Sequence, residues 1–245
     1  MSTVVPVPDV GPIKQRPLQF FWIADHSGSM SGVKIAILNQ AIREALQPVR
    51  DAVAAHPEVP IMMRAIKFAD IADWHVGPAA VSVEKFVWPE LSTAGGTTGT
   101  AQALRLLAGE LTMEKMPRRG YPPVCILVSD GFCSDPPEEY EAAIAEIVKL
   151  PWGKRAVRLA IAVGDPADYD ENALLKFVSH SEVGVLKADT PQKLINYIRW
   201  ASVAASVGSS GGKSKAGGSE PDSQNVILPA LPAEPAVTSN NLDVF

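Results

Sequence analysis

Carboxylate and hydroxyl side chains alternate in the stretch Asp25-His26-Ser27-Gly28-Ser29, which directly follows an apolar run over residues 18–24. An apolar run that stops at small polar residues predicts a buried strand that ends in a loop. Asp25, Ser27 and Ser29 carry hard oxygen donors, and no thiolate or imidazole pair lies beside them. Such donors suit Mg²⁺, Mn²⁺ or Ca²⁺ better than Zn²⁺. The stretch therefore predicts one part of a site for a small divalent cation.

Two further loops carry oxygen donors in similar positions. The glycine-rich loop over residues 95–100 contains Thr98 and leads into a predicted helix, and Asp130 follows the apolar run over residues 124–128. In open α/β sheets, ligands bind at the carboxyl ends of the strands. We therefore expect the three loops to meet there and to offer a few oxygen ligands, with waters completing the shell, as is usual for Mg²⁺.

Strands and helices must alternate along the chain to place these loops together. Apolar runs predict strands over residues 18–24, 61–68, 124–128, 157–163 and 183–186, with residues 70–76 as a short antiparallel edge strand. Helical spacing of apolar residues predicts helices over residues 35–53, 103–111, 137–149, 171–179 and 192–205. We expect Pro48 to kink the first helix or end it early and Asp135 to be the N-cap of the third. The fold class is therefore α/β, with a doubly wound, mostly parallel, Rossmann-like sheet.

Composition divides the chain into three segments. Residues 1–16 are proline-bearing and expected to be extended, residues 17–207 form one α/β domain, and residues 208–245 form a flexible Gly/Ser/Pro-rich tail. The apolar, proline-broken stretch 226–232 within the tail is either disordered or a short docking peptide.

Charge and composition bear on partners and compartment. The formal net charge is −5, which argues against binding to nucleic acid or to an anionic membrane surface. No apolar stretch reaches the roughly 20 residues needed to cross a bilayer, and the N-terminus lacks the features of a secretory signal. The two cysteines, Cys125 and Cys133, do not form a disulfide framework. We therefore expect a cytoplasmic protein.

The three loops together resemble the metal-ion-dependent adhesion site of the von Willebrand factor A (vWA) domain family. Asp25-His26-Ser27-Gly28-Ser29 matches the family's D-x-S-x-S signature, and Ser129-Asp130-Gly131 matches its strand-ending aspartate. The segment 98–104 matches the threonine motif, which selects Thr98 rather than Thr97. All five site positions are intact, so the resemblance implies a vWA fold with a metal site formed by Asp25, Ser27, Ser29, Thr98 and Asp130.

The resemblance also implies a role for each residue. Ser27, Ser29 and Thr98 would contact the cation directly, while Asp25 and Asp130 would act largely through water. A partner protein would supply an Asp or Glu to the remaining position. Mg²⁺ is the first choice for the cation, and Mn²⁺ and Ca²⁺ are the alternatives.

A narrower resemblance concerns the segment 196–207, which is similar to the C-terminal helix of stand-alone vWA proteins from bacterial tellurite-resistance loci. It implies an adaptor in a stress-response system, with a serine/threonine kinase and a PP2C-type phosphatase as partners.

We predict a metal-dependent protein-interaction module rather than an enzyme, because the sequence offers no nucleotide-binding motif or catalytic dyad. Two alternatives stay open. The same oxygens could serve a metal-assisted phosphoester hydrolase, which would need a second metal or a general base. Alternatively, the domain is a scaffold that docks its partners through the C-terminal tail.

Overall fold

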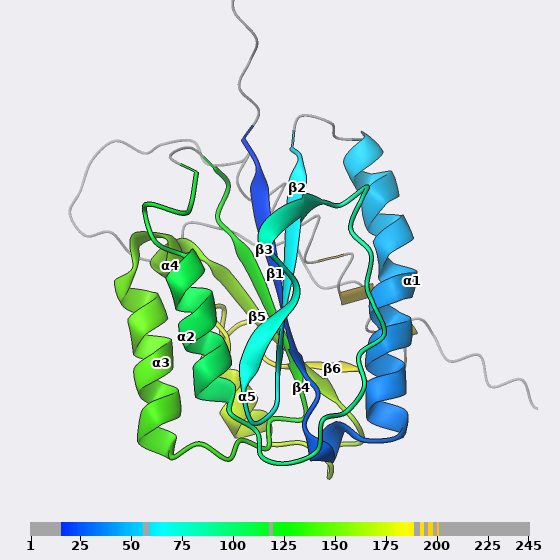
Figure 1. Ribbon diagram of the computed structural model, residues 1–245, viewed down its shortest axis with the longest axis vertical. Helices are drawn as coiled ribbons and strands as arrows, with labels where there is room; N and C mark the ends of the chain where they lie inside the picture. The colour runs from blue at the N-terminus through cyan, green and yellow to red at the C-terminus, as the bar shows by residue number, and fades with distance from the viewer. Residues whose placement is uncertain are drawn as a thin grey trace, which may run out of the picture.

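A six-stranded sheet forms the centre of the part of the chain that the structure describes (Figure 1). The computed structural model describes residues 16–55, 59–117 and 120–188, together with residues 192, 193, 196, 197 and 200. The strand order is β3-β2-β1-β4-β5-β6, with bounds β1 Leu18–Asp25, β2 Ile61–Phe68, β3 Ala72–Ser82, β4 Val124–Ser129, β5 Val157–Val163 and β6 Leu186–Ala188. Neighbouring strands are parallel except β2 and β3, which are antiparallel. The predicted doubly wound α/β sheet with one antiparallel edge strand is confirmed.

Helices cover both faces of this sheet (Figure 1). Helix α1 (Val33–Ala55) packs on one face. The opposite face is covered by α2 (Thr100–Glu110), α3 (Pro137–Lys149), α4 (Pro151–Arg155) and α5 (Glu171–Phe177). A single 3₁₀ turn, η1 (Gly28–Met30), connects β1 to α1. Among the described residues, every helix is too short or too polar to span a lipid bilayer.

Strand β1 lies in the middle of the sheet and is buried along its whole length. Phe20 and Trp22 belong to the core beneath α1, whereas Phe21 and Ile23 belong to the core on the opposite face. Burying one such side chain stabilises the fold by about 1.5–3 kcal/mol. A strand buried on both faces consists mostly of apolar residues. The strand could therefore be predicted from the apolar run over residues 18–24.

The order in which the chain adds strands to the sheet reverses between β1 and β4. From β1 the chain adds β2 and β3 on one side, and then it returns to add β4, β5 and β6 on the other. Such a reversal leaves a crevice outside the carboxyl ends of the two central strands, where ligands bind in open α/β sheets. Asp25 ends β1 and Asp130 follows β4, so the sheet topology brings both carboxylates to this crevice.

The edges of the sheet differ from the prediction. Strand β3 continues to Ser82, six residues beyond the predicted end at Val76, and its register against β2 shifts on both sides of Ala65. At the other edge, β6 begins at Leu186, later than predicted. The predicted N-terminal segment lies almost wholly outside the described residues, and so do most of the helix over residues 192–205 and the whole tail.

Helix α1 does not end early at Pro48, so the second of the two expected effects of this proline does not occur. The helix runs on to Ala55. Leu46 is buried in the core on one side of the proline, and on the other side Arg50 donates a hydrogen bond to the carbonyl oxygen of Val83 at 3.0 Å. These tertiary contacts offset the cost of an interior proline, which is about 3 kcal/mol.

Asp135 does not cap α3, contrary to the prediction. The N-cap of α3 is Pro136, which makes no side-chain cap bond. The carboxylate of Asp135 instead accepts a hydrogen bond from the backbone N–H of Ala101 at 2.6 Å, in the first turn of α2. First-turn amides have no partner within their own helix. Asp135 therefore caps a helix that lies beside it in space and not the one that follows it in sequence.

A buried ion pair joins β2 to α2. Nη1 of Arg64 lies 2.5 Å from Oε2 of Glu110, and both side chains are less than a tenth exposed. Gln19 accepts a second bond from the guanidinium at 3.0 Å, and the guanidinium lies 4.4 Å from the ring centroid of Phe21. Burial lowers the pKa of Arg64, while the charge of Glu110 opposes that shift. The carboxylate of Glu110 therefore compensates the buried positive charge of Arg64.

Replacing Glu110 by alanine should lower the free energy of unfolding by about 3–5 kcal/mol, because the Arg64 charge would stay buried without its counter-ion. The measurement is urea denaturation followed by tryptophan fluorescence. Glu139 forms an exposed pair with Arg105, so Glu139→Ala is the matched control and should cost at most about 1 kcal/mol. Equal losses in the two variants would contradict the role given to the buried pair.

Candidate metal centre

Asp25 is completely buried at the carboxyl end of β1 and joins that strand to β4. Its Oδ2 accepts a hydrogen bond from the hydroxyl of Ser129 at 2.6 Å. Its Oδ1 accepts the backbone N–H of Ser27 at 2.9 Å. Both of these donors are neutral. Asp25 therefore lies at the junction of two loops, with the second loop held by a hydroxyl that sequence reasoning did not assign to the site.

The two serines of the first loop present their hydroxyls side by side. Ser27 Oγ lies 3.2 Å from Ser29 Oγ. Ser27 is buried and Ser29 is exposed, because the 3₁₀ turn that starts at Gly28 lifts Ser29 toward solvent. Two hydroxyl oxygens at this separation can both contact one small cation.

Thr98 lies in a loop that contacts both of the others. The first loop approaches through Gly28, whose added Cβ would lie 3.6 Å from the Cα of Gly95. The third loop approaches through Ser134, which exchanges two hydrogen bonds with the Thr98 backbone, each of 3.0 Å. Thr98 itself is 5% exposed.

Thr97 forms its hydrogen bonds with Asp70 and not with the residues of the predicted site. Its hydroxyl donates to Oδ1 of Asp70 at 2.6 Å, and its backbone N–H donates to the same oxygen. These bonds lower the pKa of the Asp70 carboxyl. Asp70 also lies against Gly96, whose φ of +79° favours glycine and whose Cβ, if present, would collide with the carboxylate. The loop is thus shaped by Asp70, and its Thr97 hydroxyl is turned to that residue.

Asp130 is completely buried and holds the third loop in place. Its Oδ2 lies 2.9 Å from Nζ of Lys34, and its Oδ1 accepts a longer bond from the N–H of Phe132 at 3.3 Å. Its carbonyl oxygen accepts the N–H of Asp170 at 2.8 Å, which ties the loop to the start of α5. The three loops predicted to meet are therefore joined by hydrogen bonds and close contacts at one end of the sheet.

Burial sets the electrostatics of the site. Desolvation raises the pKa of Asp25, the hydrogen bonds from Ser129 and Ser27 oppose that shift, and the nearby charge of Asp130 adds to it. A carboxylate that has lost its hydration and received only neutral donors is stabilised by a nearby cation. The remaining donors are hydroxyl oxygens, as hard divalent cations prefer. The residues present therefore fit such a cation.

This donor set differs from the commonest type of metal site. Within the described ranges, no group of three or more His, Cys, Asp or Glu side chains is placed to hold a metal ion. The set predicted here instead combines two carboxylates with three hydroxyls. The nearby Cys133 is half-buried, and burial raises the pKa of its thiol, which favours the protonated form over the thiolate that binds metals.

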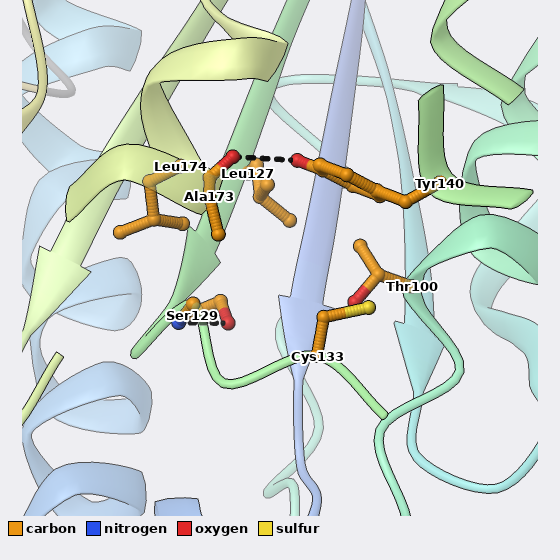
Figure 2. Close-up of a pocket in the computed structure, with 8 residues that line it drawn as sticks. Thr100, Leu127, Ser129, Cys133, Tyr140, Ala173 and Leu174 are labelled. Carbon is orange, nitrogen blue, oxygen red and sulfur yellow. Dashed lines mark hydrogen bonds between the residues drawn. The ribbon is translucent and has the colours of Figure 1, made fainter. Parts of the chain in front are cut away.

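A small cavity lies behind the Asp130 loop, on the side of α3 and α5 (Figure 2). Its volume is about 10 Å³, which is room for about one water. The hydroxyl of Tyr140 lines it and donates to the carbonyl oxygen of Ala173 at 3.0 Å (Figure 2). Burial raises the pKa of Tyr140, so this phenol remains a neutral donor. The cavity is thus too small for an organic ligand. Its lining residues pack the Asp130 loop against α3 and α5.

Three residues that shape the site were not assigned to it from the sequence. Ser129 was recognised only as part of the S-D-G motif, and neither Lys34 nor Asp70 was singled out. Ser129 directly follows a predicted strand and Asp70 lies two residues beyond one. Position at a strand end is therefore the signal that could have identified both. Lys34 reaches the site from the first turn of α1, and no local pattern indicates that contact.

Comparison with known proteins identifies the fold. The chain matches no protein-family model and no curated protein. Among solved structures it is similar to a von Willebrand factor type A protein from Catenulispora acidiphila (TM-score 0.57, 18% identity, 78% of this chain and 43% of that chain). It is also similar to proximal thread matrix protein 1 from the mussel byssus (TM-score 0.53, 18% identity, 78% and 47%). A third similar structure is the ArnB paralog VWA2 from Sulfolobus acidocaldarius (TM-score 0.53, 16% identity, 75% and 44%).

The similarity to these three proteins covers only part of each of them. The chain spans less than half the length of each of the three proteins. Together with the strand order and the single antiparallel edge strand, they show that the described domain has the vWA fold.

Replacing Gly131 by alanine should distort the Asp130 loop. Gly131 has a φ of +77°, and an added Cβ would lie 2.5 Å from the carbonyl oxygen of Asp170. We expect the free energy of unfolding to fall by about 1–3 kcal/mol, measured by urea denaturation. The matched control is Gly109→Ala in α2, where an added Cβ meets nothing within 4 Å; it should be neutral or stabilising by up to about 1 kcal/mol. A tolerated Gly131→Ala would mean that the loop relaxes freely.

Proposed function

We propose that this chain is a metal-dependent protein-interaction module. In this proposal Asp25, Ser27, Ser29, Thr98 and Asp130 hold a divalent cation, and a carboxylate of a partner protein completes its coordination. The observation that carries the proposal is the meeting of the loops after β1 and β4 with the loop before α2 at the reversal point of the sheet, where two fully buried carboxylates lie near a pair of hydroxyls. Mg²⁺ is the proposed cation, with Mn²⁺ and Ca²⁺ as alternatives.

The nature of the donors supports binding of an external carboxylate. The serine and threonine hydroxyls are neutral ligands, so direct contact through them would leave most of the positive charge on the cation. Asp25 is already engaged by Ser129 and Ser27, and Asp130 by Lys34. In this proposal both carboxylates act on the cation through water. A cation held in this way keeps its attraction for an additional anionic oxygen.

Exposed apolar side chains accompany the site. Val33 starts α1, Ile71 lies in the turn after β2, and Phe132 follows Asp130 by two residues; they are 73%, 70% and 47% exposed. All three belong to segments at the carboxyl end of the parallel strands, where the three loops lie. Large exposed apolar side chains near a charged centre are typical of interaction surfaces. We therefore propose that the partner presents its Asp or Glu beside an apolar side chain.

The biological setting is a narrower proposal. The resemblance of the segment 196–207 to stand-alone vWA proteins of tellurite-resistance loci supports a cytoplasmic adaptor in a stress-response system. Its partners would be a serine/threonine kinase and a PP2C-type phosphatase. Most of that segment lies outside the described residues, so the proposal depends on sequence resemblance alone.

Removing one hydroxyl should weaken metal binding without unfolding the domain. Ser29 is exposed, so Ser29→Ala should keep the fold and lose a direct oxygen ligand. We expect the affinity for Mg²⁺ or Mn²⁺ to fall by about tenfold or more, because even loss of an outer-shell partner can cost that much. Isothermal titration calorimetry measures the effect. Ser31 is also exposed and lies two residues further on, so Ser31→Ala is the control and should bind as the wild type does. Equal heats from all three proteins would exclude the proposed site.

Partner binding should depend on both the metal and the apolar rim. Immobilised wild-type protein should retain its partner in Mg²⁺ and release it in EDTA, while Ser29→Ala should retain much less of it than wild type at the same limiting Mg²⁺ concentration. Phe132→Ser should weaken retention several-fold, because an apolar contact is lost at the site. Val148→Ser is the control, since Val148 is 41% exposed on α3. Retained proteins are identified by mass spectrometry.

The same experiment separates the alternatives. A protein truncated after residue 207 should still retain the partner; loss of the partner with metal binding intact would favour docking through the tail. Retention in EDTA equal to that in Mg²⁺ would rule out a metal-dependent interaction. A kinase and a phosphatase among the Mg²⁺-dependent partners would support the narrower proposal.

A further inference from the structure

Lys34 brings a fixed positive charge to the site. Its Nζ lies 2.9 Å from Oδ2 of Asp130 and 2.9 Å from the carbonyl oxygen of Asp168. The Lys34 side chain is 18% exposed and that of Asp130 is completely buried. The ammonium is therefore held by two oxygens from two different loops, one following β4 and one following β5.

The path of the side chain is also confined. An added Cβ at Gly164 would lie 3.0 Å from Cε of Lys34, so the stem of the lysine passes close to the backbone at the end of β5. Nζ also lies 5.8 Å from the ring centroid of Phe132, within the range of a cation–π contact. With Nζ bonded to two oxygens and the stem confined, the position of the charge is well defined.

The buried carboxylates explain why a charge is needed there. Asp25 and Asp130 are both completely buried, and Asp25 accepts hydrogen bonds from two neutral donors, the Ser27 N–H and the Ser129 hydroxyl. An uncompensated buried charge is strongly destabilising. Lys34 supplies the one positive charge that reaches either carboxylate among the contacts of the described residues.

We propose that Lys34 is a built-in counter-ion of Asp130 that lowers the affinity of the site for a divalent cation. This inference rests on the proposed function. Without metal, the ammonium compensates Asp130 and keeps the site formed. When a divalent cation binds, it meets the repulsion of the ammonium and a carboxylate whose charge is already partly compensated. Lys34 thereby keeps the site formed in the absence of metal and lowers its affinity for a divalent cation. It acts on the metal through Asp130 and is a positioning residue.

The alternative role for Lys34 is packing alone, through its stem against Gly164. Two substitutions separate the roles. Lys34→Met keeps an unbranched side chain and removes the charge, whereas Lys34→Arg keeps the charge. If the charge sets the affinity, Arg restores wild-type behaviour and Met does not.

The test is calorimetric titration of Mg²⁺ and Mn²⁺ into the full chain. We expect Lys34→Met to bind about tenfold more tightly than wild type, because a repulsive unit charge a few ångströms from a divalent cation is removed. Lys34→Arg should bind within a few-fold of wild type. Lys176 forms a surface pair with Glu141 on α3, so Lys176→Met removes the same charge elsewhere and should leave the affinity unchanged.

Thermal unfolding adds a second readout. In EDTA, Lys34→Met should melt at a lower temperature than wild type, because Asp130 loses its counter-ion. Saturating Mn²⁺ should raise its melting temperature by more than it raises that of wild type, as tighter binding to the folded state requires.

The outcomes distinguish this inference from the function on which it rests. If wild type binds metal and Lys34→Met binds equally or more weakly, Lys34 does not act as a competing counter-ion. The same conclusion follows if Lys34→Arg shifts the affinity as Lys34→Met does. If neither wild type nor any variant binds Mg²⁺ or Mn²⁺, the proposed function fails and this inference fails with it.

Discussion

The hydrogen bond from the Ser129 hydroxyl to Asp25, 2.6 Å long, joins the carboxyl ends of β1 and β4 where the sheet reverses its direction. Parallel strands pair along their length, but nothing in that pairing specifies how the loops beyond them are arranged. Here a buried carboxylate accepts one bond from its own loop and one from the neighbouring strand. Burial makes the loss of either bond costly, so the two loops are held in one arrangement. The shape of the candidate site follows from this constraint.

Sequence reasoning was most successful where burial leaves little choice of residue. The central strands are hidden on both faces, so their positions appear as continuous apolar runs, and the bounds of β5 were predicted to the residue. The meeting of the Asp25 and Asp130 loops follows from the same logic, because the carboxyl ends of parallel strands share one edge of the sheet. The Thr98 loop precedes α2 rather than following a parallel strand, and its assignment depended on the resemblance of its sequence motif. The metal ligands themselves remain predictions, supported by the geometry and awaiting the titration.

Prediction failed where contacts distant in sequence decide the outcome. Asp135 has the chemistry of an N-cap, but the amide that it caps belongs to α2, which precedes it by more than 30 residues. Lys34 directly precedes the helix predicted over residues 35–53, and only the folded chain brings its ammonium to Asp130 across 96 positions of sequence. Pro48 stays within α1 because the flanking residues are anchored to the core and to the β3–α2 connection. Each case is a tertiary contact that outweighs a local preference.

Strand β3 has a further consequence for the molecule as a whole. It forms one edge of the sheet, and an edge strand can template unwanted pairing with another chain. Pro78 lies within this strand and lacks an N–H to donate, and the register shift beside Ala65 interrupts the regular ladder. Both features are known to discourage edge-to-edge aggregation. The chain therefore protects this sheet edge from self-association, while Val33, Ile71 and Phe132 leave apolar side chains exposed beside the loops at the carboxyl end of the parallel strands.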